Sequence, residues 1–94
     1  MERLTVTIVG QDILELADSL FRENKVNPVN RVKESKLGNF RTFTYIFEFD
    51  ENDFIKRRRD LLNSFGKETT HLLPMYCYHD WSQIYIFKKI AFRT

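Results

Sequence analysis

The sequence predicts an α+β fold in which an antiparallel sheet carries two helices on one face. Segments 4–9, 40–49 and 83–92 have apolar residues at every second position, which is typical of strands. Two amphipathic segments at helical spacing follow residues 10 and 50. With 94 residues and 43% hydrophobic content, the chain is long enough for one core, so we expect a single domain over residues 1–94.

The first strand and helix are predicted by a change of period. Residues Leu4 to Val9 alternate between apolar side chains and threonines, and Gly10 ends the strand. Asp12 is placed to cap a helix over about residues 12 to 25, with Glu15 three positions on completing a capping box. The buried side of this helix is marked by apolar residues at helical spacing: Ile13, Leu16, Ala17, Leu20 and Phe21.

The middle of the chain predicts a hairpin. Pro28 prevents simple continuation of the helix and starts an extended segment, roughly Val29 to Lys36, whose polar content suits a charged edge strand. Residues 37–39 read Leu-Gly-Asn, a hairpin turn signal. The strand over 40–49 then carries aromatic residues along one side: Phe43, Tyr45, Phe47 and Phe49.

The last third of the chain predicts the second helix and the final strand. Asp50 or Asn52 is expected to cap a second helix that runs to about Ser64, with Gly66 as its stop. Residues 67–80 form either a long loop or an edge strand, and the final strand spans Gln83 to Phe92. The order βαββαβ, with one extra strand near 71–79 as an option, predicts a ferredoxin-like sandwich with two helices on one face of an antiparallel sheet.

Composition and charge exclude several classes of function. The net charge of +2 is too small to indicate nucleic-acid binding by itself. Apolar runs are too short for a transmembrane helix, the N-terminus lacks the layout of a signal peptide, and Cys77 has no internal partner. We therefore expect a cytoplasmic protein. Scarce alanine with abundant Phe, Ile, Asn and Lys is common where coding DNA is AT-rich, which favours a phage or mobile-element origin.

The sheet face away from the helices is the main candidate for function. If the aromatic side of strand 40–49 packs on the helices, the other side is left open, and its expected residues are Thr5, Thr7, Val9, Thr42, Thr44, Ile46, Glu48, Tyr85, Phe87 and Lys89. Tyr85 and Phe87 there could stack single-stranded bases or pack on a second sheet. A structural role for this pair, beneath residues 67–80, is equally open.

The basic run at residues 56–59 does not form one patch. On a helix, four consecutive side chains point in four directions. Lys56 and Arg59 are expected to face solvent and Arg57 to lie on a flank. Arg58 falls within the apolar side, so its guanidinium reaches the edge of the helix, pairs with a carboxylate or faces a partner. We favour the first of these alternatives.

The residues with metal-ligand or nucleophile chemistry gather in one segment. His71, Cys77, His79 and Asp80 match no standard zinc spacing, and a Cys-His nucleophile would also need an orienting group and an oxyanion hole. No carboxylate pair or phosphate loop is present either. The sequence therefore predicts a protein without catalytic residues, metal or cofactor, and a structural role for this segment.

One stretch resembles a known family. Residues 4–12 read LTVTIVGQD and are followed by an amphipathic helix and LFRENKVNP, which is similar to the first half of an ACT regulatory domain over about thirty residues. This resemblance implies a small-ligand sensor with an effector at the Gly10 turn.

We expect a non-enzymatic, homodimeric protein-interaction or regulatory module that modulates a larger protein. The expected contact residues on the open face and in segment 67–81 are Thr42, Thr44, Ile46, Tyr76, Tyr78, Trp81, Tyr85 and Phe87. The alternatives are the ACT-like sensor and a single-stranded RNA- or DNA-binding protein that stacks bases on Tyr85 and Phe87. In the latter, phosphates would meet Arg57, Arg58, Arg59, Lys88, Lys89 and Arg93.

Overall fold

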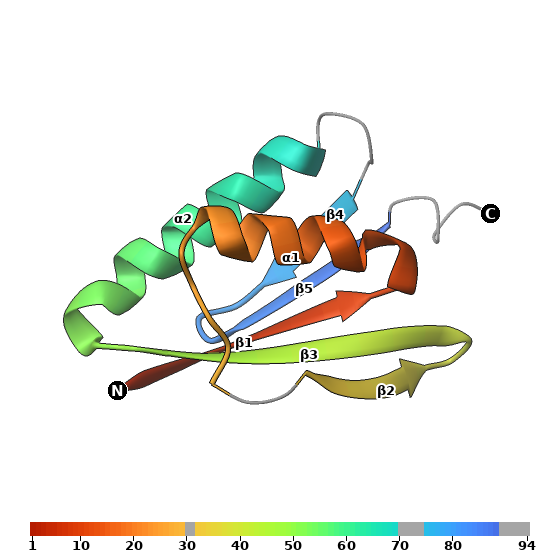
Figure 1. Ribbon diagram of the computed structural model, residues 1–94, viewed down its shortest axis with the longest axis horizontal. Coiled ribbons are helices and arrows are strands. Elements are labelled where there is room, and N and C mark those ends of the chain that lie inside the picture. Colours follow the sequence, from red (N-terminus) through yellow and green to blue (C-terminus); the bar gives the residue numbers. More distant parts are fainter. Residues whose placement is uncertain (30–31, 70–74, 89–94) are drawn as a thin grey trace.

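Two helices cover one face of a mixed sheet in the computed structural model (Figure 1), which describes residues 1–29, 32–69 and 75–88. The strands are β1 (Glu2–Val9), β2 (Lys33–Leu37), β3 (Phe40–Phe49), β4 (Met75–His79) and β5 (Gln83–Lys88). The helices are α1 (Leu14–Glu23), entered through a short 3-10 turn at Gln11–Ile13, and α2 (Glu51–Thr69). The sheet order is β2-β3-β1-β5-β4.

The direction of the last strand corrects the predicted topology. Without the edge strand β4, the chain follows the predicted β-α-β-β-α-β order, and β1 pairs antiparallel with β3. However, β5 runs parallel to β1, whereas the ferredoxin-like sheet needs its last strand antiparallel to the first. The reason is the extra strand β4. It follows α2 in the direction that the ferredoxin-like fold gives to its last strand, and β5 pairs antiparallel with it. The direction of β5 is therefore reversed.

The predicted bounds are right for β3, whereas β1 begins two residues before the predicted Leu4 and β2 begins at Lys33 rather than near Val29. The helices differ from the prediction at two points. Asp12 lies inside the 3-10 turn, and the N-cap positions are Gly10 for that turn and Ile13 for α1, so Asp12 is not the N-cap residue that the sequence predicts. Gly66 does not end the second helix, because α2 continues to Thr69. The charged edge strand is confirmed as β2, and the strand option within 67–80 as β4. Residues 89–92 of the predicted last strand lie outside the described part.

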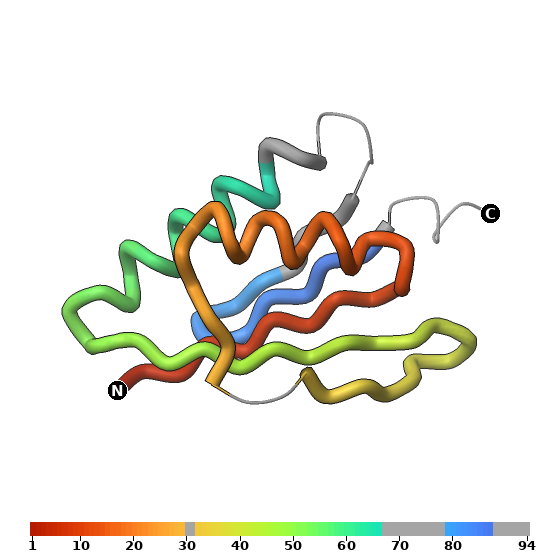
Figure 2. Tube along the Cα trace, viewed as in Figure 1, coloured from red at the N-terminus to blue at the C-terminus, as the bar shows by residue number. Residues whose placement is uncertain are grey.

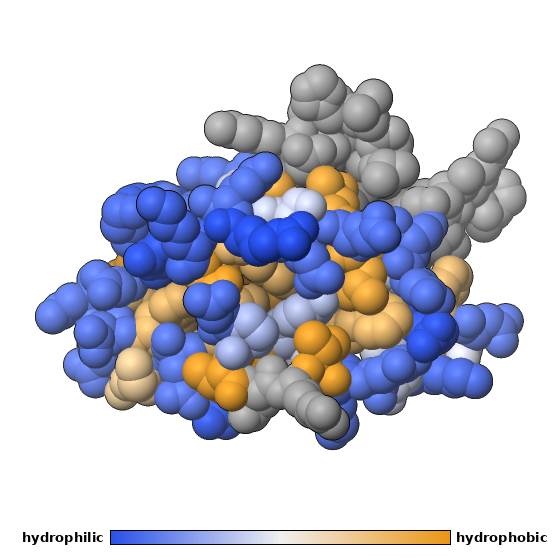
Figure 3. All heavy atoms as spheres, viewed as in Figure 1, coloured by the Kyte–Doolittle hydropathy of each residue, from blue (hydrophilic) through white to orange (hydrophobic). Residues whose placement is uncertain are grey.

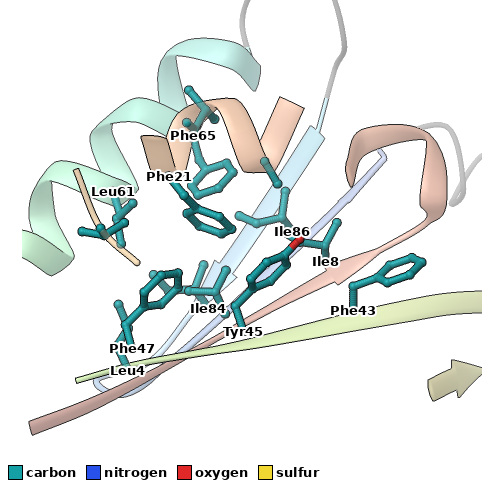
Figure 4. Packing of buried hydrophobic residues seen from close by; sticks show 14 of the residues in the cluster. Leu4, Ile8, Phe21, Phe43, Tyr45, Phe47, Leu61, Phe65, Ile84 and Ile86 are labelled. Atoms are coloured by element: carbon teal, nitrogen blue, oxygen red, sulfur yellow. The ribbon is translucent and has the colours of Figure 1, made fainter. Parts of the chain in front are cut away.

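The core lies between the helices and one side of the sheet (Figure 4). Phe47 is fully buried, and the rings of Phe21 on α1 and Phe47 have centroids 5.0 Å apart. Phe21 also contacts Phe65 of α2 with centroids 5.9 Å apart, so it joins both helices to the sheet. The aromatic side of β3 is therefore the helix-covered side, as the alternation predicts.

The end of α1 is fixed by hydrogen bonds rather than by Pro28. Lys25 has a φ of 56°, its N–H donates to Arg22 O, and the Val26 N–H donates to Phe21 O over 3.1 Å, which is a Schellman motif. Asn24 adds bonds to Leu20 O and to the Ser64 hydroxyl of α2. The end of α1 is thereby attached to the second helix, and the chain is directed toward β2 (Figure 2).

One polar pair is built into the core. The Tyr45 hydroxyl donates to Asp18 Oδ1 of α1 over 2.7 Å, and Tyr45 is only 4% exposed. Burial raises the pKa of Tyr45 above its ordinary value, and the hydrogen bond to the Asp18 carboxylate and the charge of that carboxylate raise it further. Because the hydroxyl has a partner, this tyrosine can be buried at small cost and serves to position α1 on β3.

Candidate interaction surface on the open sheet face

The open face is the side of the sheet opposite the two helices. The register aligns Thr7 of β1 with Thr44 of β3 on one side and with Tyr85 of β5 on the other. Val9 is aligned in the same way between Thr42 and Phe87. Residues directly opposite each other across paired strands share a face, so these rows place the predicted open-face residues together.

The centre of the open face is apolar or rich in threonine and is already packed. Thr7 is 9% exposed and Thr42 is 7% exposed, although no helix covers them. Ile46, Tyr85 and Phe87 are half-buried. The side chains at this centre are therefore largely shielded from solvent before any partner arrives.

Several polar groups of the open face bond to one another. The hydroxyls of Thr7 and Thr44 are 3.3 Å apart and share a hydrogen bond, and the Tyr85 hydroxyl donates to Gln83 Oε1 over 3.0 Å. Arg3 pairs with Glu48 at 3.4 Å near the end of the face. Since an unsatisfied buried polar group costs about 1–3 kcal/mol, this internal pairing lowers the cost of covering the face.

Two exposed apolar residues extend the open face beyond its expected members. Leu37 and Phe40 lie opposite each other at the tip of the β2–β3 hairpin and are 62% and 46% exposed. Alternation along the strand could have predicted Phe40. This residue precedes Thr42 by two positions and so falls on the same side of β3. The hairpin tip lies at one edge of the sheet in Figure 2.

Edge strand β4 continues the rows of the open face. Its register aligns Tyr78 with Tyr85 and Tyr76 with Phe87. These positions belong to the same side of the sheet as the two residues they oppose. The predicted set Thr42, Thr44, Ile46, Tyr85 and Phe87 is thus brought together, and Tyr76 and Tyr78 occupy register positions beside it.

Trp81 lies on the other side of the sheet from this set. It sits in the turn between β4 and β5, where its ring contacts Phe54 of α2 with centroids 5.3 Å apart. The Arg58 guanidinium lies over the same ring at 5.3 Å. Trp81 therefore packs on the second helix, although it is 56% exposed. Alternation of side chains applies to strands and not to turns, so the sequence could not predict on which side of the sheet Trp81 lies.

Arg58 of α2 binds the β4–β5 turn through hydrogen bonds. Its Nε donates to Trp81 O over 2.9 Å and its Nη2 to Asp80 O over 2.7 Å, with His79 Nδ1 at 3.2 Å from Nη2. The guanidinium thus reaches the helix edge, as favoured from the sequence, and binds main-chain carbonyls there instead of a carboxylate. Asp80 completes the turn, since its Oδ1 accepts from the N–H groups of Ser82 and Gln83.

The other residues of the basic run belong to the helix layer. Arg57 donates to Asn24 O over 3.1 Å and so helps to close the end of α1. Lys56 bonds Asp60, which lowers the pKa of that carboxyl, and Arg59 is exposed. In Figure 3, hydrophilic residues lie at the left and right of the face shown, and hydrophobic residues are seen toward the middle. Of the other expected phosphate contacts, Lys88 ends β5, and Lys89 and Arg93 lie outside the described residues.

The remaining chemical candidates are the metal-ligand residues and the Gly10 turn. Within residues 1–29, 32–69 and 75–88, no group of three His, Cys, Asp or Glu could hold a metal ion. His71 lies outside that part. At the Gly10 turn, the Gly10 N–H donates to Arg41 O over 2.8 Å, and Arg41 Nη1 donates to Gln11 Oε1 over 2.6 Å.

Neither α1 nor α2, as far as they are described, is long and apolar enough to cross a membrane.

Comparisons with family models, curated proteins and solved structures found no match to this chain.

Proposed function

We propose that this chain is a small non-enzymatic, regulatory protein-interaction module that docks a larger protein on its open face. The observation that carries the proposal is the arrangement of that face. Its centre is apolar or threonine-rich, with the Thr7 and Thr44 hydroxyls bonded to each other, and its charged residues Arg3, Glu48 and Lys33 lie around that centre. An apolar centre with a polar rim is the usual anatomy of a protein–protein interface.

Half-buried aromatic residues supply the anchors for such an interface. Tyr85 and Phe87 stand in rows with Thr7 and Val9, so a partner side chain would meet groups whose positions are already fixed. Fixed side chains lose little conformational freedom on binding, and tyrosine is among the residue types enriched at the positions that dominate binding energy.

The nucleic-acid alternative is weakened by the distribution of cations. Bases stacked on Tyr85 and Phe87 would lie on the open face, whereas Arg57, Arg58 and Arg59 lie on α2 in the opposite layer. Arg57 and Arg58 also make internal bonds. Single-strand binding combines stacking with cations along the same groove. The α2 arginines therefore do not serve bases on the open face, where Arg3 and Lys33 are the cations already described and Arg3 is paired with Glu48.

The ligand-sensor alternative is also weakened. The main-chain N–H at Gly10 that an anionic effector would use already donates to Arg41 O. The parallel β5 further departs from the ferredoxin-like sheet on which that alternative depends.

Two measurements test the proposal. Labelled single-stranded RNA and DNA are titrated at low and near-physiological salt, and the proposal expects no binding at either. Affinity that falls steeply with salt would contradict it in favour of nucleic acid. Affinity capture from the source cells then compares wild type with Phe87→Arg and with Ile55→Arg, a matched change at an exposed position of α2.

The expected result of the capture is a discrete protein bound by wild type and by Ile55→Arg and lost with Phe87→Arg. Circular dichroism and thermal melting establish that both variants fold. Equal capture by the two folded variants would contradict docking on the open face.

A further inference from the structure

The two edge strands of the sheet differ in how they are protected. Both have five residues, but β2 reads KESKL and is exposed throughout, whereas β4 reads MYCYH and contains no Asp, Glu, Lys or Arg. Charged residues on an edge strand discourage pairing with another chain, and their absence leaves an edge able to pair. Within the part of the chain that the structure describes, no strand pairs with the outer side of β4.

The turn fixes which main-chain groups of β4 point outward. The Asp80 N–H donates to Gln83 O over 3.0 Å, so this pair is a hydrogen-bonded one. In an antiparallel pair, hydrogen-bonded and non-hydrogen-bonded positions alternate, so Tyr78 and Tyr76 also bond toward β5. The N–H and C=O groups of the other three residues, Met75, Cys77 and His79, are therefore directed to the outer edge.

We propose that β4 pairs antiparallel with β4 of a second copy of this chain, about a two-fold axis at Cys77. The register then sets Met75 opposite His79 of the second copy and Cys77 opposite its own counterpart. All outward main-chain groups of both strands are matched, because each hydrogen-bonded pair exchanges two bonds. The interface is the same patch on both copies, as a two-fold dimer requires.

The occupant is a second copy because the edge complements itself. Its outward residues fall at the first, third and fifth positions of the strand, so antiparallel pairing about the third matches each of them. The paired sheets would be continuous, and the open faces of the two copies would adjoin. This inference goes beyond the proposed function, since an open face can dock a partner from a monomer as well.

Cys77 makes the pairing directly measurable, because it is the single cysteine of the chain. In a hydrogen-bonded antiparallel pair the two Cα atoms are about 5.5 Å apart, which lies within the range that a disulfide bridges. Mild oxidation or a short thiol-to-thiol cross-linker is therefore expected to convert the purified protein to a covalent dimer. The matched control is the double variant Cys77→Ser, Ser35→Cys, whose only thiol lies at the centre of the charged edge β2. It is expected to give no covalent dimer under the same conditions, although its β4 edge can still pair.

Sedimentation equilibrium tests the non-covalent dimer. Cys77→Pro removes an outward N–H and keeps the bonds between β4 and β5, so we expect a dissociation constant at least tenfold higher than that of wild type. Cys77→Lys places two like charges opposite each other across the axis and is expected to have the same effect if the proline variant does not fold. Tyr78→Pro, which removes an inward N–H, should instead lower thermal stability.

A wild-type protein that remains monomeric at several hundred micromolar would overturn the pairing, as would equal cross-linking of the thiols on β2 and β4. Such a result leaves docking on the open face intact. Conversely, loss of partner capture with Phe87→Arg in a protein that still dimerises separates the two proposals.

Discussion

Arg58 offers the sharpest test of how the second helix holds the β4–β5 turn. Arg58→Ala removes two hydrogen bonds from a guanidinium to main-chain carbonyls, at 2.9 and 2.7 Å, and the contact of the cation with the Trp81 ring. Arg59→Ala one residue on is the matched control, because Arg59 is exposed on the same helix.

The expected loss can be worked from these contacts. Hydrogen bonds from a charged donor contribute about 1.5–3 kcal/mol, and partial exposure at this turn reduces each to about 1 kcal/mol. An exposed cation–π contact adds about 0.5 kcal/mol. We therefore expect Arg58→Ala to lower the free energy of unfolding by about 2.5 kcal/mol, and Arg59→Ala to change it by less than about 0.5 kcal/mol.

Urea unfolding followed by fluorescence measures the difference, because Trp81 is the only tryptophan of the chain. Arg58→Lys retains the charge without the planar fork and should lose about 1 kcal/mol. Equal unfolding free energies for the Arg58→Ala and Arg59→Ala proteins would refute the reasoning. An unchanged Trp81 emission spectrum in folded Arg58→Ala would contradict the fixed position of the turn.

The remaining predictions concern the helices and the core pair. Lys25→Gly should raise the free energy of unfolding by about 1 kcal/mol, because Lys25 holds a left-handed conformation with φ of 56°; an unchanged or lower value would contradict the helix end described above. Gly66→Ala should stabilise by about 0.5–1 kcal/mol, since a Cβ there meets nothing within 4 Å, and destabilisation would show that α2 ends earlier. Tyr45→Phe should cost about 1–2 kcal/mol at pH 7 in urea unfolding, and a smaller loss would contradict the bond to Asp18. The raised pKa of Tyr45 means that above about pH 10 the unfolded chain loses this proton while the folded chain keeps it, so wild-type stability falls as pH rises, by up to about 1.4 kcal/mol per pH unit. The Tyr45→Phe protein should lack that component, and parallel pH profiles for the two proteins would contradict it.

Alternation of side chains predicted most of the open face. Phe43, Tyr45 and Phe47 are buried beneath the helices, so Thr42, Thr44 and Ile46 had to face the other way. The same rule could have added Phe40. Alternation works for β1 and β3 because one side of each strand is buried, which makes the pattern strict.

The direction of β5 could not be predicted in the same way. The side-chain pattern of a strand is the same whether it pairs parallel or antiparallel, so Ile84 and Ile86 indicate burial and not direction. Direction followed from whether β4 exists. One added strand reverses the direction of the strand that follows it. The sequence of residues 67–80 is compatible with either a loop or a strand, so the direction of β5 stayed open.

The positions of Arg58 and Trp81 also required the structure. An arginine on the apolar side of a helix indicates that its guanidinium must find partners at an edge, and it does not identify them. The partners are the carbonyls of Asp80 and Trp81, more than twenty residues away in the sequence. Contacts of this kind depend on the turn between β4 and β5, whose position only the fold determines.

Site-specific photo-cross-linking tests the central claim most directly. A benzoylphenylalanine is placed at Phe87 on the open face or at Ile55, which is 59% exposed on α2, and each protein is irradiated in the source cells. Docking on the open face predicts a discrete adduct with a protein larger than this chain from position 87, and none from position 55. The same adduct from both positions, or an adduct with nucleic acid from position 87, would contradict the claim.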